Sequence, residues 1–460
     1  MDRSDGTGRI GSRFDGEGRR IARDPDAILR TRFGYPGFRP GQRELVDAVL
    51  AGRDALGVLP TGGGKSVCYQ IPALLLPGLT IVVSPLVSLM VDQLRRAIEV
   101  GLRAEALHAG LPFDERRRIE SELEGGRVRV LLLAPERLAS GRFARLIPRL
   151  GASLLAVDEA HCISMWGHDF RPAYRTIGAL RESLRVPVLA LTATATPRVR
   201  EDIEASLRMR NPVRILGSFD RPNLLWSVRK VGESMVSRGR GNGVLIREAV
   251  ATMPGARLVY ASTRGRVESL RAGLARHGIR AEAYHAGLPP DERDRVQRYF
   301  LRHPRPLVVA TNAFGMGIDR SDVRIVVHDQ LPGSLEDYYQ ESGRAGRDGL
   351  PALCLALHTA GDARVHRSFL DRAHPPLRRI QAFRGLGSVD EWRERVERRR
   401  VGKRKLLGVA RYARTRGCRR RELLSWFGEC VKDRVCGSCD RCMPLQELVA
   451  RIPTNGSGLA

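Results

Sequence analysis

Apolar runs of four to six residues alternate with longer amphipathic stretches along most of the chain. The runs lie at residues 55–59, 80–84, 128–133, 154–157 and 188–191, and again at 257–261, 306–311, 324–328 and 352–357. Strands that are apolar throughout are typical of parallel sheets, because helices cover both faces of such sheets. The stretches between them, such as residues 89–100, have helical periodicity. The pattern therefore predicts an α/β fold with parallel sheets.

One segment occurs twice and relates the two sets of strands. Residues 103–116 read RAEALHAGLPFDER and residues 280–293 read RAEAYHAGLPPDER, so twelve of the fourteen positions are identical. Each copy follows a strand and a helix and precedes another apolar strand. A reused linker would not repeat its flanking elements, so the sequence predicts two tandem copies of one α/β lobe.

The pattern changes at both ends of the chain. The N-terminal segment is rich in Gly, Arg and Asp without apolar periodicity, and residues 230–243 form a poorly periodic loop near the lobe junction that we expect to be mobile. Arginine-rich helical stretches at 393–400 and 403–416 lead into a cysteine cluster. The predicted division is a flexible arm at 1–24, a first lobe at 25–217, a second lobe at 218–361, a small, mostly helical module at 362–443 and a tail at 444–460.

The net charge of the chain indicates which class of molecule it binds. The 460 residues include 78 Lys and Arg against 51 Asp and Glu, a formal net charge of +27. Such an excess favours a polyanion, and nucleic acid first, although an arginine-rich solvated surface is the simpler interpretation. We expect neither a secretory signal nor a membrane partner, since no apolar run approaches the ~18 residues of a spanning helix. Eight cysteines without a signal indicate a reducing compartment.

A glycine-rich turn follows the first predicted strand and precedes a helix. Backbone N–H groups of such a turn, together with a helix N-terminus, bind phosphate, and glycines allow the close approach. Lys65 is expected to reach the β and γ phosphates of a nucleotide, and the Ser66 hydroxyl to bind Mg²⁺. Leu59 stands where the strict motif has its first glycine. The residues of the turn are Thr61, Gly62, Gly63, Gly64, Lys65 and Ser66.

Two adjacent carboxylates end the strand at 154–157. We expect Asp158 to hold Mg²⁺ through water, and Glu159 to orient and deprotonate the water that attacks the γ-phosphate. Thr192 and Thr194 follow another strand, and their hydroxyls are expected to bond to this acidic pair and to couple the nucleotide state to lobe movement. Threonines also cap helices, which is the simpler interpretation of that segment.

The second lobe contributes two arginines spaced three residues apart, within QESGRAGRDG at 340–349. An arginine that crosses a cleft neutralises the charge that develops on a transferring phosphate. We expect one of the two, Arg344 or Arg347, to have this role, and an ordinary basic helix is the alternative.

Four cysteines have the spacing of a metal site. Cys436, Cys439 and Cys442 form C-x2-C-x2-C, and Cys418 completes a four-thiolate set suited to tetrahedral Zn²⁺. The spacing also resembles that of iron–sulfur proteins, but Gln446 stands where the next cysteine would be. The sequence therefore favours a structural zinc.

Together these motifs resemble the RecQ family of DNA helicases. The resemblance rests on FGYPGFRPGQ at 33–42, the TGGGKS turn, the threonine-rich segment, the arginine segment and, most specifically, DEAHCISMWGHDFRP at 158–172. It extends from Ala27 to Cys442 and implies two RecA-like lobes, ATP and Mg²⁺ in the cleft between them, and a zinc module. It also implies that the aromatic residues of 158–172 couple single-strand binding to ATP hydrolysis.

The resemblance assigns further residues. Tyr35 would stack on adenine, Gln42 would contact the base through its amide, and Arg39 belongs to the same motif. The family also places Gly317, Asp319 and Gln340 near the nucleotide. It makes Arg347 the first choice for the arginine that reaches the phosphate, and Arg344 the second. The DNA-binding or coupling positions that it implies are Ser84, Pro85, His161, Trp166, His168, Phe170, Arg171, Thr192, Thr194, Thr311 and Asn312.

The implied activity is ATP-dependent 3′-to-5′ unwinding of DNA in repair or recombination. We expect a cytoplasmic, nucleoid-associated monomer that acts on single-stranded and forked duplex DNA, with a single-strand-binding protein or other repair proteins as partners. Larger family members continue into a winged-helix domain, and we expect a compact form without it. A DNA-stimulated translocase or annealing factor with little unwinding is the second interpretation, and a scaffold with a vestigial ATP site the third. The family resemblance alone disfavours RNA as the substrate.

Overall fold

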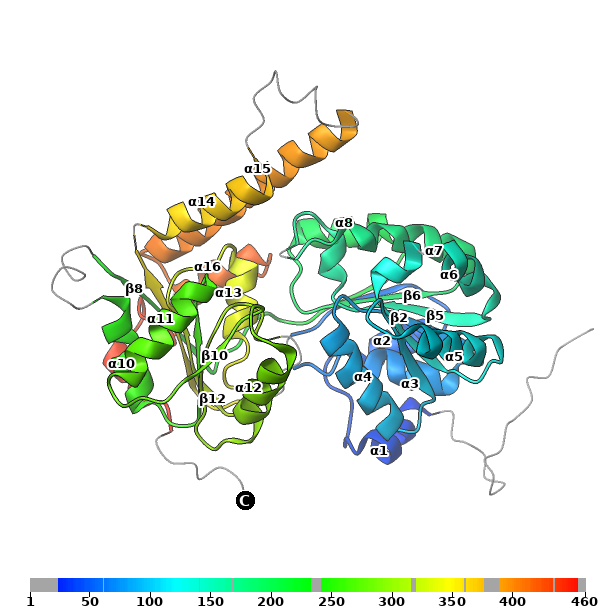
Figure 1. Cartoon of the computed structure of the whole chain (residues 1–460), viewed down its shortest axis with the longest axis horizontal. Coiled ribbons are helices and arrows are strands. Elements are labelled where there is room, and N and C mark those ends of the chain that lie inside the picture. Colours follow the sequence, from blue (N-terminus) through cyan, green and yellow to red (C-terminus); the bar gives the residue numbers. More distant parts are fainter. Residues whose placement is uncertain are drawn as a thin grey trace, which may run out of the picture.

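The computed structural model describes residues 24–60, 62–139, 141–167, 169–232, 241–315, 320–359, 361–375, 389–432 and 435–453. Two parallel sheets, each covered by helices, form two lobes, and a helical module follows the second lobe (Figure 1). Residues 1–23 of the predicted arm and residues 233–240 of the predicted junction loop lie outside the described residues.

The first lobe is built around a seven-stranded parallel sheet. In spatial order its strands are β3 (Ala104–Leu107), β4 (Val130–Leu133), β2 (Leu79–Val83), β5 (Ala152–Val157), β6 (Val188–Thr192), β1 (Ala55–Val58) and β7 (Val213–Leu216). Its α-helices are α1 (Pro25–Phe33), α2 (Gln42–Leu50), α3 (Val67–Leu75), α4 (Val87–Glu99), α5 (Phe113–Glu124), α6 (Gly141–Leu146), α7 (Ile177–Leu184) and α8 (Pro197–Ser206). Short 3-10 helices are η1 (Pro135–Ala139), η2 (Ile147–Arg149), η3 (Ala160–Ile163) and η4 (Pro172–Thr176).

The second lobe has a six-stranded parallel sheet. Its strands, in spatial order, are β10 (Glu282–Tyr284), β11 (Leu307–Ala310), β9 (Ala256–Tyr260), β12 (Val323–His328), β13 (Ala352–His358) and β8 (Leu224–Lys230). Its helices are α10 (Asn242–Thr252), α11 (Arg264–Ala275), α12 (Pro290–Arg302) and α13 (Leu335–Ser342).

The two sheets have the same strand order, from β3 to β1 in the first lobe and from β10 to β8 in the second. The repeated segment forms β3 and the start of α5 in one lobe, and β10 and the start of α12 in the other. In the first copy Arg118 binds Glu105 at 3.0 Å and Glu115 at 2.8 Å. In the second copy Arg295 makes the equivalent pairs with Glu282 at 2.8 Å and Glu292 at 3.0 Å. The prediction of two tandem α/β lobes is confirmed.

The helical module consists of α14 (Asp362–Ala373), α15 (Val389–Arg414), α16 (Arg419–Trp426) and α17 (Leu445–Ala450). The two arginine-rich stretches predicted at 393–400 and 403–416 belong to one 26-residue helix, α15, which Figure 1 shows beside α14. A Cβ on Gly402 would lie 2.5 Å from Leu370 of α14, so the glycine permits close packing of the pair and does not end the helix. The start of the predicted tail is helical, and its Leu448 is fully buried against the second lobe.

The core consists mainly of the strands, whose apolar side chains are buried on both faces of each sheet. All positions of β1, β2, β4, β6, β11, β12 and β13 are buried, which is the burial that the continuous apolar runs predict. In the described part of the chain, every helix is too short or too polar to cross a membrane.

Candidate active site and metal centre

The glycine-rich turn leads from β1 into α3. Gly62 and Gly64 have φ angles of +78° and +68°, a left-handed conformation that glycine adopts without steric cost. A Cβ on Gly63 would lie 2.7 Å from the carbonyl oxygen of Pro60. Because α3 begins directly after Ser66, the N-terminus of the helix faces the turn. This arrangement suits a phosphate group.

Gln42 and Arg39 hold the turn from the preceding segment. Gln42 Nε2 donates to the carbonyl oxygens of Gly63 at 2.9 Å and Gly64 at 3.0 Å, and its Oε1 accepts from the Arg39 backbone N–H at 2.8 Å. Arg39 Nη1 donates to the carbonyl oxygen of Gly62. Tyr35 is 50% exposed. The Gln42 amide, which the family resemblance assigns to adenine, is thus bonded to the glycine-rich turn and to the backbone of Arg39.

Asp158 and Glu159 follow β5 at the carboxyl edge of the sheet. Gln93 Nε2, from α4, donates to Asp158 Oδ2 at 2.6 Å, and the Glu159 backbone N–H donates to Asp158 Oδ1 at 2.9 Å. Glu159 has a φ of +47°, a strained conformation for a residue with a side chain. Such strain is typical of functional sites, where the backbone conformation determines the direction of a side chain. Gln93 belongs to no recognisable motif, and sequence reasoning missed it.

The two carboxyl groups have different proton affinities. Burial, and then the charge of Glu159, raise the pKa of Asp158 to about 6. Burial acts on Glu159 too, but His161, Lys65 and Arg344 outweigh it and hold the pKa of Glu159 below its usual range. At neutral pH Glu159 is therefore ionised and can accept hydrogen bonds, whereas Asp158 loses its proton only near pH 6.

His161 joins the acidic pair to the threonine segment. Its Nδ1 lies 3.3 Å from Glu159 Oε2 and 2.8 Å from Thr192 Oγ1. The backbone N–H of Thr194 donates to the same Thr192 oxygen at 3.3 Å, and both threonines are buried. The Thr192 hydroxyl was expected to bond to the acidic pair directly, but the ring of His161 from η3 lies between Thr192 and Glu159.

Arg344 and Arg347 approach the first lobe from the end of α13. Arg344 Nη1 donates to the carbonyl oxygen of Gly315, and its charge acts on Glu159 across the cleft. Arg347 Cδ lies 3.8 Å from the position that a Cβ on Gly62 would take, so this arginine reaches the glycine-rich turn. A cavity of about 190 Å³ lies between the lobes. Its lining includes Glu159, His161 and Arg171 from the first lobe and Asn312, Gln340, Glu341 and Arg344 from the second.

The connection between the lobes braces the arginine segment. Arg221 Nη2 donates to the carbonyl oxygens of Ala345 at 3.0 Å and Gly346 at 2.9 Å. Asn223 Nδ2 donates to those of Gly346 at 2.8 Å and Leu350 at 2.9 Å. Sequence reasoning missed both residues, whose sole local signal is a short polar run between two apolar strands.

The aromatic loop, residues 164–171, follows η3. Trp166 and Phe170 are half-buried, and Trp166 packs against the core. Arg171 Nη1 donates to the carbonyl oxygen of Pro85 at 2.5 Å, and Arg171 also binds Asp169 at 3.1 Å. Ser84 is fully buried, so its side chain does not reach the surface where DNA was expected to bind.

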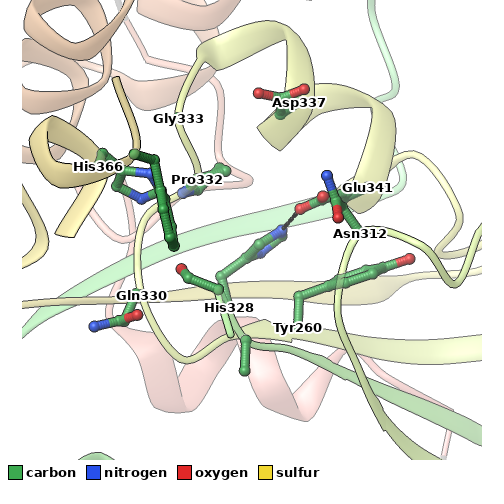
Figure 2. A pocket seen from close by; sticks show the side chains of 12 residues that line it. Tyr260, Asn312, His328, Gln330, Pro332, Gly333, Asp337, Glu341 and His366 are labelled. Carbon is green, nitrogen blue, oxygen red and sulfur yellow. Dashed lines mark hydrogen bonds and ion pairs between the residues drawn. The ribbon is translucent and has the colours of Figure 1, made fainter. Parts of the chain in front are cut away.

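Asn312 lines a second cavity, of about 220 Å³, between the second lobe and α14 of the helical module (Figure 2). There His328 Nε2 lies 2.8 Å from Glu341 Oε2, and the His328 ring stacks on Tyr260 with 5.5 Å between ring centres. Burial, and then Glu341, raise the pKa of Asp337 in its wall to about 7. Because Asn312 and Glu341 line both cavities, the second cavity adjoins the one between the lobes.

Thr311 follows β11 and is partly exposed, and Asn312 is exposed. Four further predicted site residues lie outside the described residues, namely Thr61, His168, Gly317 and Asp319.

The four cysteines of the predicted metal site converge. The Sγ atoms of Cys418, Cys436, Cys439 and Cys442 all lie within 4.8 Å of one another, with Cys436 and Cys442 at 3.9 Å and Cys439 and Cys442 at 3.5 Å. Tetrahedral zinc with Zn–S bonds of about 2.3 Å separates its sulfurs by about 3.8 Å. The set therefore fits Zn²⁺, whereas an iron–sulfur cluster would hold the thiolates further apart. Cys430 is exposed and outside this set.

Three family models match the chain in succession. A DEAD/DEAH box helicase model matches residues 39–203, a helicase conserved C-terminal domain model matches 244–349, and a RecQ zinc-binding model matches 360–443.

Curated relatives match most of the chain. The ATP-dependent DNA helicase RecQ of Pasteurella multocida is 40% identical over 418 residues, which are 90% of this chain and 62% of that protein. The protein of the same name from Bacillus subtilis is 39% identical over 90% of this chain and 66% of its own length. The RecQ-like DNA helicase blm-1 of Caenorhabditis elegans is 38% identical over 90% of this chain and 41% of its own length. The chain thus spans less than two thirds of these relatives.

Solved structures share the fold at lower identity. The helicase MrfA bound to DNA superposes with a TM-score of 0.62 at 20% identity, over 76% of this chain and 53% of that chain. The Mycobacterium smegmatis helicase Lhr bound to ssDNA and AMP-PNP gives a TM-score of 0.55 at 21% identity, over 75% of this chain and 49% of that chain.

Proposed function

This chain belongs to the RecQ family of DNA helicases, and we propose that it couples ATP hydrolysis to 3′-to-5′ movement along single-stranded DNA and to duplex unwinding. The observation that supports this most directly is the cavity between the lobes, where Glu159 and His161 meet Gln340 and Arg344. A site shared between two lobes can open and close with each nucleotide, and such closure is the usual source of directed movement.

ATP binds in this proposal with its phosphates at residues 61–66, where Lys65 pairs with the β and γ phosphates. Tyr35, Arg39 and Gln42 hold the adenine. The support for this is that Gln42 and Arg39 contact the glycine-rich turn, so the residues assigned to the base lie beside those assigned to the phosphates.

Hydrolysis uses side chains of both lobes. Glu159, kept ionised by its neighbours, accepts a proton from the attacking water, and Arg347 stabilises the charge on the transferring phosphate. Asp158 and Ser66 would hold a Mg²⁺, which supplies neutralisation of the phosphate oxygens. Arg344 fixes the turn at Gly315, and Gly317, Asp319 and Gln340 are assigned to the nucleotide contact from lobe two.

Single-stranded DNA lies across both lobes in this proposal. Bases stack on Trp166 and Phe170, with His168 and Arg171 beside them, and the strand continues past Thr311 and Asn312. Pro85 supports Arg171, and His161 with Thr192 and Thr194 relays occupancy of the DNA site to Glu159. The net charge of +27 predicts a steep loss of DNA affinity with added salt.

The experiment is ATP hydrolysis with and without single-stranded DNA, followed by unwinding of forked duplexes that carry either a 3′ or a 5′ tail. We expect stimulation by DNA and unwinding from the 3′ tail alone, with Lys65→Ala as the inactive control. ATP hydrolysis that DNA leaves unchanged would refute the proposal. Stimulation without strand separation would favour the translocase or annealing factor, and equal stimulation by RNA would change the substrate class.

We further assign a structural Zn²⁺ to the four cysteines, and propose a monomer that works on cytoplasmic, nucleoid DNA alongside a single-strand-binding protein or other repair proteins. Metal analysis and light scattering of the purified chain test the first two of these statements.

A further inference from the structure

Helix α15 of the zinc module packs on the aromatic loop of the first lobe. The guanidinium carbon of Arg404 lies 5.5 Å from the ring centre of Trp166, and that of Arg398 lies 4.7 Å from the ring centre of Phe170. Arg175 of the first lobe lies 5.1 Å from Phe170. Cations at these distances are attracted by the ring face.

An acidic residue of α15 fixes this packing. The Glu394 carboxylate accepts from Arg175 at 2.9 Å and from Arg398 at 2.5 Å, so one residue of the helix ties both arginines that flank Phe170. Bases stack more strongly on aromatic rings than an exposed guanidinium does. DNA that stacks on the ring faces covered by Arg398 and Arg404 would displace these arginines, and α15 would then respond to DNA.

Lys405, about three turns beyond Glu394 on α15, contacts the aromatic loop of the first lobe, and α15 itself packs on α13 of the second lobe, where the ring centres of Tyr412 and Tyr338 lie 5.4 Å apart. The Lys405 Nζ donates to the carbonyl oxygen of Gly167, which lies between the two aromatic residues. Burial lowers the pKa of Lys405, and the negative charges of Glu336 and Asp337 on α13 oppose that effect. Glu336 is 3% exposed, and within the described part of the chain its Oε2 receives no hydrogen bond.

Helix α13 leads directly to the arginine segment. Gln340 and Glu341 of this helix line the cavity between the lobes, and Arg344 and Arg347 follow its C-terminal end. A shift of the aromatic loop can therefore pass through Lys405 into the helix that positions both arginines.

We propose that Lys405 is a positioning residue that links the aromatic loop to α13 and so determines how strongly DNA stimulates ATP hydrolysis. This inference rests on the proposed function. It assigns the zinc module a part in coupling, in addition to its structural part.

The test compares Lys405→Met with Lys403→Met in the full chain. Methionine keeps the length and the apolar stem of the lysine and removes its charge and donors, and Lys403 is an exposed lysine of the same helix. ATP hydrolysis is measured without DNA and with saturating oligo-dT, and oligo-dT affinity is measured by fluorescence anisotropy. For Lys405→Met we expect DNA-free hydrolysis within two-fold of wild type, affinity within three-fold, and a stimulated kcat reduced at least ten-fold. Lys403→Met should match wild type.

Zinc content and Tm show whether Lys405→Met folds. Glu336→Gln tests the same link from the second lobe without altering the module, and we expect the same selective loss of stimulation. The double variant should lose no more than either single one, since both changes break one link.

Each outcome discriminates. Full stimulation in Lys405→Met and in Glu336→Gln overturns the inference and leaves the proposed function standing. An equal fall of DNA-free and stimulated hydrolysis in Glu336→Gln also overturns it, because a general structural defect then explains the loss. Absence of stimulation in the wild-type chain overturns the proposed function and the inference with it.

Discussion

The two lobes place an aspartate at the same point of the same fold and surround it differently. Asp158 follows β5 and Asp329 follows β12, and the backbone N–H of each donates to the last carbonyl of the neighbouring strand at 2.9 Å. In the first lobe the neutral amide of Gln93 donates to the carboxylate at 2.6 Å. In the second lobe Arg266 binds both carboxylate oxygens at 2.7 Å.

The comparison separates what topology decides from what charge decides. Strand order determines where the carboxylate lies, and a side chain on the helix after the neighbouring strand determines whether its charge is available. A carboxylate bonded to an amide can still bind a cation, whereas one paired with a guanidinium is already neutralised. The first lobe is thus suited to a nucleotide with its metal, and the second supplies arginines.

The largest effect is expected from removing the arginine that the second lobe contributes to the site between the lobes. Arg347→Ala should lower the kcat of ATP hydrolysis by about 10³-fold or more, because an arginine that crosses to the phosphate contributes that much. ATP affinity should change only a few-fold, since Lys65 and the glycine-rich turn remain. Steady-state kinetics and nucleotide binding measure the two quantities. Arg302→Ala, at an exposed arginine of α12, is the control, and a loss below ten-fold would contradict the role given to Arg347.

The next largest effect is expected from pairing Asp158 of the first lobe with an arginine, as Asp329 of the second lobe is paired with Arg266. Gln93→Arg should place a guanidinium on Asp158 and reduce Mg²⁺-dependent ATP hydrolysis about 10- to 100-fold, the usual effect of changing a residue that supports a metal ligand. Hydrolysis is titrated with Mg²⁺ in both variants. The matched change, Arg266→Gln, should leave hydrolysis within three-fold of wild type. If the two variants lose activity equally, the charge difference between the lobes is not the reason for their division of labour.

A smaller effect is expected from pH. Asp158 has a pKa raised to about 6 from 3.8, so it is protonated below pH 6 and ionised above it. Mg²⁺-dependent ATP affinity should therefore rise as the pH increases through about 6, by up to ten-fold per pH unit below that value. Gln93→Leu removes a hydrogen bond that favours the ionised form, so the midpoint should move to higher pH. A midpoint that stays in place or falls would show that Gln93 does not control this carboxylate.

The smallest effect tests the likeness of the lobes. Arg118 and Arg295 make the equivalent exposed ion pairs of the two repeated segments. Arg118→Ala and Arg295→Ala should each cost about 0.2–1 kcal/mol of stability, by equal amounts, in low salt. Denaturant unfolding measures both, and unequal costs above ~1 kcal/mol would show that the copies have diverged in their packing.

Much of the fold could be predicted because the signals are local. Continuous apolar runs predicted the strands, and the repeated segment predicted the second lobe. The spacing of the cysteines predicted a cluster that the geometry fits. The edge strands β7 and β8 and the strand in each repeated segment were missed, since they are short or of mixed polarity.

The rest could not be predicted because it depends on distant partners. Gln93 is one of several polar residues of an amphipathic helix. Its contact with Asp158 exists only in the folded sheet, where the end of β5 lies next to α4. Arg221 and Asn223 lie in a loop, and their hydrogen bonds to Gly346, which is far away in the sequence, form only in the folded chain. Gly402 reads as a helix break, and α15 passes through it because Leu370 needs the space of the missing side chain.

The cysteine cluster has a consequence for the solution behaviour of the chain. Cys439 forms a β-bridge with Trp226 on β8, the last strand of its sheet, and Trp226 exchanges backbone hydrogen bonds of 2.9 Å with Ser438 and Asp440. The loop that carries Cys436, Cys439 and Cys442 therefore covers the edge of the sheet at β8, which would otherwise present unpaired N–H and C=O groups to other molecules. Chelation should uncover that edge, and chains stripped of metal should adhere to one another before either lobe unfolds.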